Sequence, residues 1–329
     1  MQMSKPVLFV SMRPLEVSPD IEAIYHAYNG PKIHLTQMFD DVESEISSGK
    51  YDLMVTDDFP TVTPGKCIMI WHGIQGGKYI GLDQPNHPFY DKSQADLMTY
   101  VISPGEMFSQ YLWSRCTGVP MERILPYGSP RTDDYAIAKY DILSRKEKNY
   151  LFVPTFRDYG ETPFPEIDWD YLDSMLNDDE ILTIKTHPWE TQTCIDQLKG
   201  FKGNGNYKHI VRVSAAGPSN GFLYNANVVI TDYSSIMFDA YLLNKPVVLF
   251  EKTTGYTDTR GMYLRYPGDY CSFFAKDEQQ LLANIRFRSA HPWLTDKETS
   301  LIHQLACNCD GHACERIINL INCMNGGET

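Results

Sequence analysis

Two short apolar runs in the second half of the chain enclose a polar turn and a short helix-like segment. Val228 to Thr231 and Pro246 to Phe250 have the length and residue types of buried strands. The polar residues of this stretch gather where the first run meets the helix. A strand, a turn, a helix and a second strand in this order are typical of an α/β fold, and the junction of strand and helix is where such proteins bind anions.

Hydroxyl groups mark this junction as a candidate phosphate site. A helix N-terminus leaves unpaired N–H groups and carries a partial positive charge, so Thr231, Ser234 and Ser235 can place hydroxyls and amides around a phosphate. Serine and aspartate are also favoured N-caps in any protein, which leaves a plain helix cap as the alternative. Asp239 lies four residues after Ser235, on the same helix face. We expect it either to accept hydrogen bonds from ribose or polyol hydroxyls or to be an exposed helix carboxylate.

The same alternation of strands and helices runs along the whole chain in two series. The strand-like runs are residues 7–11, 32–35, 53–56, 66–71, 99–102 and 124–127 in the first series, and 149–154, 181–185, 210–213, 228–231 and 246–250 in the second. A polar, helical connector is expected over residues 133–147. Further helices are expected over 278–290, from 301 onward and over 311–325.

This organisation predicts an α/β protein with two Rossmann-like domains in tandem, each with a largely parallel sheet. We place the first domain at residues 1–145 and the second domain, with terminal helices, at residues 146–329. A chain of 329 residues is long enough for two domains of about 150 residues, each with its own core. Ligands of such domains bind at the carboxyl ends of the strands, so the expected site is the cleft between the domains.

Composition limits the function further. A hydrophobic fraction of 43% and a charged fraction of 22% are ordinary for a soluble globular protein, and no apolar run approaches the roughly 20 residues that span a bilayer. The first residues form a strand-like run without the features of a signal peptide, so we expect a cytoplasmic protein. The net charge of -13 argues against a protein that wraps nucleic acid and against general attachment to an anionic membrane.

The eight cysteines raise the question of a metal site. Four of them, Cys307, Cys309, Cys314 and Cys323, crowd the C-terminal segment near two histidines. Their spacing is not that of a common zinc finger or ribbon, and part of the segment has a helical apolar pattern. Reduced, partly buried cysteines are the favoured interpretation, and the sequence implies no cofactor, with a divalent cation left open.

Reactive side chains come directly after several of the expected strands. Trp71 and His72 follow the fourth run and precede the glycine-rich stretch 73–77. His72 is the best candidate for a general base, because an imidazole is neutral near pH 7 and the glycines allow a substrate to approach the backbone closely. A histidine packed at a strand end for structural reasons is the alternative.

Three more expected strands end in groups that bind phosphate. These groups are Arg131 after the run 124–127, Thr155 and Arg157 after the run 149–154, and Lys185, Thr186 and His187 after the run 181–185. An arginine can fork onto phosphate, and His187 can donate to a phosphate oxygen or, as imidazolium, offset charge on a leaving group. Each cluster alone is also compatible with a surface turn, but together they suit a pyrophosphate.

Common nucleotide-binding and nucleophile motifs are absent from the sequence. It contains no P-loop signature, no G-x-G-x-x-G after the first strand and no G-x-S-x-G elbow. Asp57 and Asp58 resemble a metal-binding pair, but a strand-end loop ahead of Pro60 is the preferred interpretation.

In order and type, these clusters resemble the CDP-glycerol glycerophosphotransferase family, whose members prime and polymerise glycerol phosphate in teichoic acids and capsule polymers. The resemblance covers about residues 65–320. The matching segments are His72-Gly73 with Lys78 and Gly81, Gly128-Ser129-Pro130-Arg131 with Asp133 or Asp134, Pro154-Thr155-Phe156-Arg157, Lys185-Thr186-His187-Pro188, Thr231-Asp232-Tyr233-Ser234-Ser235 with Phe238-Asp239, Arg260-Gly261-Met262-Tyr263, and Asp310-Gly311 through Arg316-Ile317.

The resemblance implies a GT-B architecture and a reaction in which glycerol phosphate, or a related polyol phosphate, passes from CDP-glycerol to an acceptor hydroxyl with release of CMP. By this resemblance His72 is the base that deprotonates the acceptor, and His187 stabilises the pyrophosphate. The implied substrate-binding residues are Gly73, Ile74, Gln75, Gly76, Arg131, Thr155, Arg157, Lys185, Thr186, Thr231, Ser234, Ser235 and Asp239. The implied partners are CDP-glycerol or another CDP-alcohol and a lipid-linked or polysaccharide acceptor, with peripheral contact at the inner face of the cell membrane.

Two features separate this chain from common members of that family. Ile74 and Gln75 stand where a threonine and a proline commonly follow His-Gly, next to the acceptor if His72 is the base. About 70 residues precede His72, without the long N-terminal extension of the large polymerases, so we expect single addition to be as compatible with the chain as polymerisation. The alternatives from other classes are a GT-B glycosyltransferase that uses a nucleotide sugar and a non-catalytic module that binds a CDP-alcohol.

Overall fold

The computed structural model of the protein describes residues 5–84, 90–137, 147–155, 166–187, 198, 200–214, 219–252 and 256–326. The chain forms two compact units, each with its own parallel sheet. Unit 1 contains Met1–Ala138 and His303–Thr329, and unit 2 contains Lys139–Ile302. The first segment of unit 1 ends at Ala138, whereas the expected boundary follows residue 145. The C-terminal segment differs from the expectation, because it belongs to unit 1 and not to the second domain.

The sheet of unit 1 is 6-stranded and parallel, in the order β2-β1-β3-β4-β5-β6. Its strands are β1 (Val7–Ser11), β2 (Lys32–Thr36), β3 (Leu53–Thr56), β4 (Lys66–Ile70), β5 (Tyr100–Ile102) and β6 (Ile124–Leu125). Its helices are α1 (Pro19–Ala27), α2 (Val42–Ser47), α3 (Phe108–Thr117), α4 (Asp133–Ile137) and α12 (Ala313–Met324), with short 3-10 helices η1 (Leu15–Val17), η2 (Gly81–Asp83), η3 (Lys92–Leu97), η4 (Met121–Arg123) and η5 (Pro130–Thr132). All six expected strands of the first series are confirmed. Part of the expected connector is α4, and the rest lies outside the described residues.

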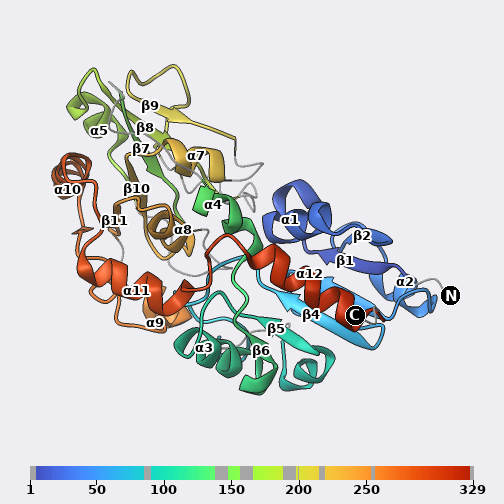
Figure 1. Cartoon of the computed structure of the whole chain (residues 1–329). Helices are drawn as coiled ribbons and strands as arrows, with labels where there is room; N and C mark the ends of the chain where they lie inside the picture. The colour runs from blue at the N-terminus through green and yellow to red at the C-terminus, as the bar shows by residue number, and fades with distance from the viewer. Residues whose placement is uncertain are drawn as a thin grey trace. The chain divides into compact units, whose positions relative to one another are not determined.

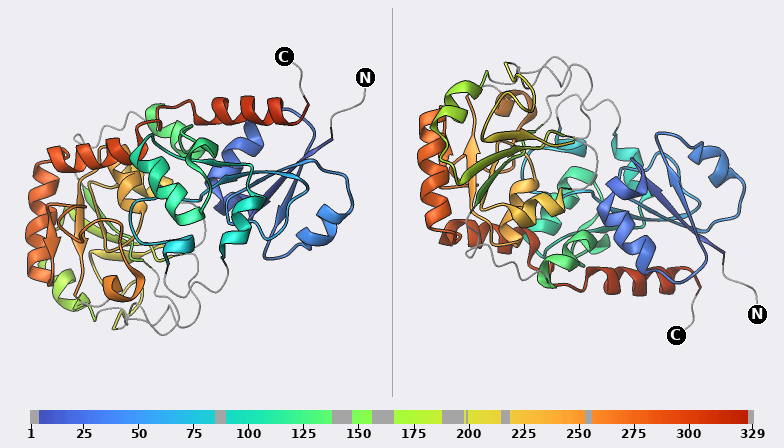
Figure 2. Two further views of the ribbon diagram at one scale, coloured as in Figure 1. Left: turned by 90° about the horizontal axis from the view of Figure 1, so that it is seen from below. Right: turned by 90° about the horizontal axis from the view of Figure 1, so that it is seen from above.

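The strands of unit 1 are apolar on both sides, so the sheet needs cover on both faces. Alternate residues of β1 enter two cores: Val7 and Phe9 lie in one, and Leu8 lies in the other. Ile317 and Ile321, one helical turn apart on α12, are fully buried in the first core. Figure 1 and Figure 2 show α12 lying along the sheet of unit 1. Full burial of such side chains stabilises a fold by roughly 1.5–3 kcal/mol each, which accounts for the return of the chain to unit 1.

Asp133 caps helix α12 from a distant part of the chain. The N–H groups of Ala313 and Cys314 donate to its two carboxylate oxygens at 2.9 and 2.8 Å. Arg316, also near the start of α12, donates to the main-chain oxygen of Tyr127 at 3.2 Å. The carboxylate satisfies N–H groups that a helix N-terminus otherwise leaves unpaired, and it places negative charge at the positive end of the helix dipole. These bonds fix the start of α12 against unit 1.

The sheet of unit 2 is also 6-stranded and parallel, in the order β12-β11-β10-β7-β8-β9. Its strands are β7 (Lys148–Phe152), β8 (Glu180–Ile184), β9 (Ile210–Arg212), β10 (Val228–Thr231), β11 (Val247–Phe250) and β12 (Phe274–Ala275). The helices are α5 (Trp169–Met175), α7 (Asn220–Asn225), α8 (Ile236–Leu242), α9 (Tyr256–Arg260), α10 (Glu278–Ala290) and α11 (Asp296–Ala306), whose last residues belong to unit 1. The expected strands of the second series are confirmed, whereas β12 is too short to show a sequence pattern. No helix of the described segments is both long enough and apolar enough to cross a membrane.

Each sheet has a position at which the strand order reverses. In unit 1, β1 lies between β2 and β3, and in unit 2, β7 lies between β8 and β10. The reversals are therefore at β1/β3 and at β7/β10. Because the strands of each sheet are parallel, their carboxyl ends share one edge, and open α/β sheets bind ligands at the point of that edge where the order reverses. The topology of each unit thus points to one place for a site.

Candidate functional site

Three loops of unit 1 meet at the edge where its strand order reverses. They follow β1, β3 and β4, which are neighbours in the sheet. Thr56 of β3 pairs with Val10 of β1 and with Met69 of β4, so the three loops leave the sheet at one level. The loops carry Met12 and Arg13, Asp57 and Asp58, and Trp71 and His72.

His72 has the geometry of a general base. Its Nδ1 lies 2.9 Å from the main-chain oxygen of Asp57. A carbonyl oxygen only accepts hydrogen bonds, so the contact assigns the proton to Nδ1 and leaves the lone pair on Nε2. The Nε2 atom is then the one that can take a proton from a substrate hydroxyl.

The surroundings of His72 keep it neutral and hold its ring. Burial, and then the positive charges of Arg13 and Arg131, lower the pKa of His72 to about 4. The imidazole is therefore unprotonated at neutral pH. The indole of Trp71 stacks on it with ring centroids 4.2 Å apart, and Trp71 in turn contacts Trp113 edge to face. A histidine packed at a strand end can make the same two contacts, so the role of His72 as a base stays a prediction.

Asp57 joins two of the three loops. Its carboxylate accepts the N–H of Met12 at 2.8 Å, and its carbonyl accepts His72. Burial raises the pKa of Asp57 to about 7 and that of Asp58 to about 6. The interpretation of this pair as a plain strand-end loop was therefore incomplete, because Asp57 orients the candidate base.

The glycine-rich loop after His72 is buried. Gly73, Ile74, Gln75 and Gly76 are all in the buried class. Gly76 has a φ of +149, and a Cβ there would come within 2.7 Å of the Leu305 side chain. Gly76 is therefore needed for packing against the C-terminal segment, and the expectation that it admits a substrate to the backbone is not supported. Gln75 is 4% exposed, and its Nε2 has no hydrogen-bond partner among the described residues.

Arg131 is used inside unit 1. Its Nη1 lies 2.7 Å from a carboxylate oxygen of Asp20, and the side chains are 6% and 0% exposed. The hydroxyl of Ser129 and the main-chain N–H of Arg131 donate to the other oxygen of Asp20 at 2.6 and 3.2 Å. The pair ties the turn before α4 to the first turn of α1. Arg131 thus holds the turn and adds positive charge near His72, and its expected contact with phosphate stays a prediction.

In unit 2, the strand ends at the reversal also lie at one level. Phe152 of β7 pairs with Ile184 of β8 and with Ile230 of β10. The loops that follow carry the expected residues Thr155, Lys185, Thr186, His187, Ser234 and Ser235. Arg157 lies outside the described residues, so its expected place in this group stays a prediction.

Asp232 organises the loops after β7 and β10. Its carboxylate accepts the N–H groups of Thr155 and Tyr233 at 2.8 and 2.7 Å. The hydroxyl of Thr231 donates to the main-chain oxygen of Val153 at 2.6 Å. Thr231 is fully buried, so its hydroxyl links the two strands and is not the phosphate donor that we expected.

The two serines before α8 remain open. Both are partly exposed, and Ser235 makes no side-chain capping bond at the start of the helix. The hydroxyl of Ser234 accepts the N–H of Ile236 at a long 3.4 Å. A plain N-cap thus does not explain Ser235. Helix α8 has only 7 residues, so its dipole contributes little to the binding of an anion. Asp239 is 3% exposed, which excludes the alternative of an exposed helix carboxylate.

Lys185 and His187, at the end of β8, differ in burial. Lys185 is 1% exposed, its Nζ donates to the main-chain oxygen of Ser214 at 3.2 Å, and it lies 5.6 Å from the centroid of the Phe222 ring. Nζ therefore makes at least one contact within the unit, and its expected role as a phosphate ligand stays a prediction. Thr186 is also buried, whereas His187 is partly exposed. The expected contact of His187 with a ligand stays a prediction.

Sequence reasoning missed three site residues, Arg13, Asp57 and Asp232. Each directly follows a strand at a reversal point, within two residues of the strand end. The signal was the one that selected His72, a polar residue after an apolar run. The order of the strands, which turns a strand end into a site, could not be read from the sequence.

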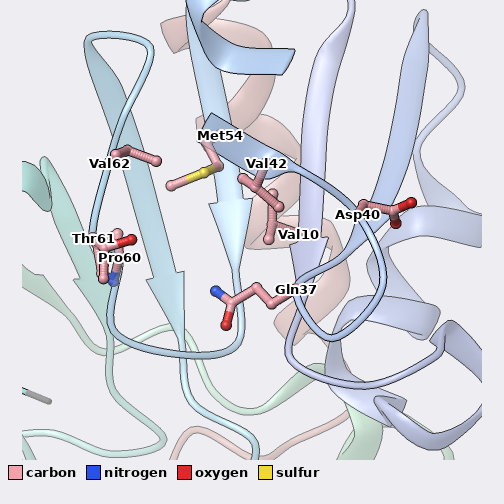
Figure 3. Close-up of a pocket in the computed structure, with 8 residues that line it drawn as sticks. All are labelled: Val10, Gln37, Asp40, Val42, Met54, Pro60, Thr61 and Val62. Carbon is pink, nitrogen blue, oxygen red and sulfur yellow. The ribbon is translucent and has the colours of Figure 1, made fainter. Parts of the chain in front are cut away.

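The structure also contains a pocket in unit 1 (Figure 3). It is lined by Val10, Gln37, Asp40, Val42, Met54, Pro60, Thr61 and Val62. The carboxylate of Asp40 accepts the N–H of Thr36 at 2.6 Å. None of the expected site residues lines this pocket, so we assign it no part in the chemistry.

The cysteines of the C-terminal segment belong to unit 1. Among the described residues, no group of three or more His, Cys, Asp and Glu side chains is placed to hold a metal ion. Burial raises the pKa of the Cys309 thiol to about 12 and raises that of Cys314 as well. Both thiols are therefore protonated at neutral pH and pack within unit 1.

The chain matches known proteins in sequence and fold. It is 26% identical over 299 residues to the teichoic acid poly(ribitol-phosphate) polymerase of Bacillus spizizenii, a match that covers 82% of this chain and 46% of the relative. It is 26% identical over 280 residues to the teichoic acid glycerol-phosphate primase of Bacillus subtilis, covering 78% of this chain and 68% of the relative. The chain thus spans about half the length of the polymerase and about two thirds of the primase.

Solved structures show the same fold. The wall teichoic acid polymerase TagF superposes with a TM-score of 0.75 at 19% identity, over 98% of this chain and 89% of that chain. The complex of Staphylococcus aureus MnaA with UDP superposes with a TM-score of 0.58 at 15% identity, over 99% of this chain and 98% of that chain. The expected GT-B architecture of two parallel α/β units is confirmed. The family model described as CDP-glycerol:poly(glycerophosphate) glycerophosphotransferase matches residues 51–323, and the chain belongs to this family.

Proposed function

We propose that the protein transfers glycerol phosphate, or a related polyol phosphate, from CDP-glycerol to an acceptor hydroxyl and releases CMP. The family supports this reaction class, and relatives are named as glycerol-phosphate primases and polymerases. The observation that carries the proposal is the hydrogen bond between His72 Nδ1 and the Asp57 carbonyl. It orients a neutral imidazole as a base at the ligand-binding edge of unit 1.

In the proposed mechanism, His72 Nε2 accepts the proton of the acceptor hydroxyl. The acceptor oxygen attacks the phosphorus that bears glycerol, and the bond from this phosphorus to the bridging oxygen breaks. The electron pair of that bond leaves with CMP. A transfer of this kind depends mainly on positioning and on charge stabilisation at the phosphate oxygens.

The partly exposed groups of unit 2 are the proposed donor ligands. Ser234 and Ser235 offer hydroxyls, and His187 offers an imidazole N–H for the pyrophosphate. Arg157 completes this set as a prediction. The reaction requires these groups and His72 to act on one substrate. A TagF structure soaked with CDPG is consistent with a CDP-alcohol as the donor.

The chemical identities of the acceptor and of the polyol are proposals as well. Relatives are named for both glycerol phosphate and ribitol phosphate, so either polyol fits the family. We propose a lipid-linked or polysaccharide acceptor in teichoic acid or capsule synthesis, used at the inner face of the cell membrane. Sedimentation of the protein with vesicles that contain such an acceptor, compared with vesicles that lack it, tests this location.

The decisive experiment incubates the protein with a panel of CDP-alcohols and nucleotide sugars, with and without acceptor, and separates the released nucleotides by anion-exchange chromatography. We expect CMP from CDP-glycerol or CDP-ribitol in the presence of an acceptor, and none from the His72→Gln variant. Release of a nucleoside diphosphate from a sugar donor would identify a glycosyltransferase. Binding of a CDP-alcohol without turnover under all conditions would identify a binding module.

A further inference from the structure

Arg13 is a cation of unit 1 that the surrounding protein does not pair. It lies two residues after the end of β1, and its side chain is partly buried. Within the described part of the chain, its guanidinium makes no hydrogen bond and no ion pair. Burial lowers the pKa of Arg13, with Asp57 and Asp58 acting on it only at a distance. A partly desolvated charge without a partner is costly, and such groups cluster where a protein binds a ligand.

Arg13 is fixed next to the candidate base. The N–H of the preceding residue, Met12, donates to the Asp57 carboxylate, and the Asp57 carbonyl accepts Nδ1–H of His72. One residue thus holds the loops of Arg13 and His72 at the β1/β3 reversal, where an α/β sheet binds its ligand. The charge of Arg13 is close enough to depress the pKa of His72.

Nearby acids act on this charge without contacting it. Asp57 has a pKa raised to about 7 and Asp58 a pKa raised to about 6, so at neutral pH the first is partly protonated and the second is mostly ionised. Asp20, which also acts on His72, is already bound to Arg131 at 2.7 Å. None of these three carboxylates forms an ion pair with Arg13 among the described residues, so the guanidinium keeps its N–H donors for an anion.

A second open donor lies in the loop that follows His72. Gln75 is 4% exposed, and its Nε2 lacks a partner among the described residues. Leaving a buried amide N–H without a partner destabilises a fold, so a ligand that accepts this bond gains affinity. Three residues of extended chain span at most about 11 Å, so Gln75 stays within reach of a substrate that touches His72.

We infer that Arg13, with Gln75 as a second donor, binds a phosphate group next to the hydroxyl that His72 deprotonates, an inference that rests on the proposed function. A guanidinium presents N–H groups in a planar fork that matches phosphate oxygens. Two substrates can bring this phosphate, an acceptor that ends in a polyol phosphate and the donor itself. The acceptor is favoured, because its last phosphate lies only a few bonds from its terminal hydroxyl and the proposed donor ligands belong to unit 2.

The inference predicts which acceptors the protein prefers. An acceptor that ends in glycerol phosphate or ribitol phosphate gains the contact with Arg13, whereas an acceptor that ends in a neutral sugar does not. The anion also offsets the charge of Arg13, so it raises the pKa of His72 and makes the imidazole a stronger base when the acceptor is bound.

Kinetics of Arg13→Met and Arg13→Lys test the inference. CDP-glycerol is paired with two soluble acceptors, one with a terminal glycerol phosphate and one that ends in a sugar hydroxyl. We expect Arg13→Met to raise KM for the acceptor that ends in glycerol phosphate by roughly 10- to 100-fold, because a hydrogen bond to a charged group is lost. The KM values for the acceptor that ends in a sugar hydroxyl and for CDP-glycerol should not change. Arg13→Lys keeps the charge without the fork and should lie between.

Arg123→Met is the matched control, because Arg123 donates to the main-chain oxygen of Met98 at 3.3 Å in the same unit, away from the three loops. It should leave all three KM values unchanged. A rise in KM for CDP-glycerol alone in Arg13→Met would move the bound phosphate to the donor and overturn the acceptor assignment. Unchanged KM values for every substrate would overturn the phosphate subsite.

A binding experiment separates this inference from the proposed reaction. NMR of protein labelled with ¹³C-histidine follows the titration of His72, whose signal is identified by its loss in His72→Gln. Arg13, Arg131, Asp20 and Asp57 are the groups that act on this ring. Glycerol 3-phosphate should raise the pKa of His72 in the wild type and not in Arg13→Met. If the enzyme is active but glycerol 3-phosphate does not raise the pKa of His72, the phosphate subsite is refuted. If the pKa rises but the protein transfers no glycerol phosphate, only the proposed reaction is refuted.

Discussion

Replacing Arg131 by methionine decides whether this arginine holds the fold or binds the substrate. Asp20 is fully buried and accepts three hydrogen bonds, from Nη1 and N–H of Arg131 and from the Ser129 hydroxyl. The substitution removes the bond at 2.7 Å and keeps the other two. Breaking a buried ion pair from one side costs roughly 3–5 kcal/mol. Because two donors to Asp20 remain, we expect about 3 kcal/mol.

Urea unfolding measures this cost, and hydrogen exchange locates it in unit 1. With an m-value of about 2–3 kcal/mol/M, a loss of about 3 kcal/mol lowers the unfolding midpoint by roughly 1–1.5 M. Asp20→Asn combined with Arg131→Met should cost less than the sum of the two single changes, because no buried charge is then left alone. Lys5→Met is the control, since its pair with Asp52 is 46% and 58% exposed and should contribute under about 1 kcal/mol. Near wild-type stability of Arg131→Met, with a raised KM for CDP-glycerol, would refute the structural role.

Four further predictions follow from the same structure. His72→Gln should abolish transfer in the CMP-release assay while CDP-glycerol still binds in calorimetry, and normal turnover would exclude His72 as the base. The pKa of His72 is about 4 in the folded state against a usual 6.5, so the unfolded chain binds more protons between these pH values. The free energy of unfolding should therefore fall as the pH drops from 6.5 to 4, and His72→Gln should flatten this part of its pH profile. Ser234→Ala with Ser235→Ala should weaken CDP-glycerol binding without changing the melting temperature by more than a few degrees, and unchanged affinity would return both serines to helix capping. Asp133→Ala should destabilise unit 1 by roughly 1–2 kcal/mol in urea unfolding through loss of the α12 cap, and protection of α12 equal to wild type in hydrogen exchange would contradict this.

The pattern of strands and helices could be predicted from the sequence because each buried strand is a short apolar run with a polar end. The same rule located His72, His187 and the serines before α8. It could not separate open polar residues from those already bonded within the fold. Lys185, Arg131 and Thr231 have the residue types of phosphate ligands, yet their donors contact Ser214, Asp20 and Val153, respectively. Such partners are distant in sequence and become neighbours only through the sheet order.

Arg13 illustrates the opposite error. A single arginine after the first strand has no motif around it, so nothing in the sequence distinguishes it from a surface residue. Its role emerges from two facts of the fold, the reversal at β1/β3 and the bonds of Asp57 to both neighbouring loops. The placement of α12 was equally hidden, because an amphipathic helix shows which face is apolar but not which core receives it.

The return of α12 to unit 1 has a consequence for how the protein is made. Unit 2 is one continuous segment, Lys139–Ile302, and can complete its core as soon as that segment has left the ribosome. Unit 1 cannot, because Ile317 and Ile321 fill its core and are synthesised after the whole of unit 2. Until then the α12 face of its sheet remains bare, and nascent chains stalled before residue 313 should be the ones that chaperones retain or that aggregate.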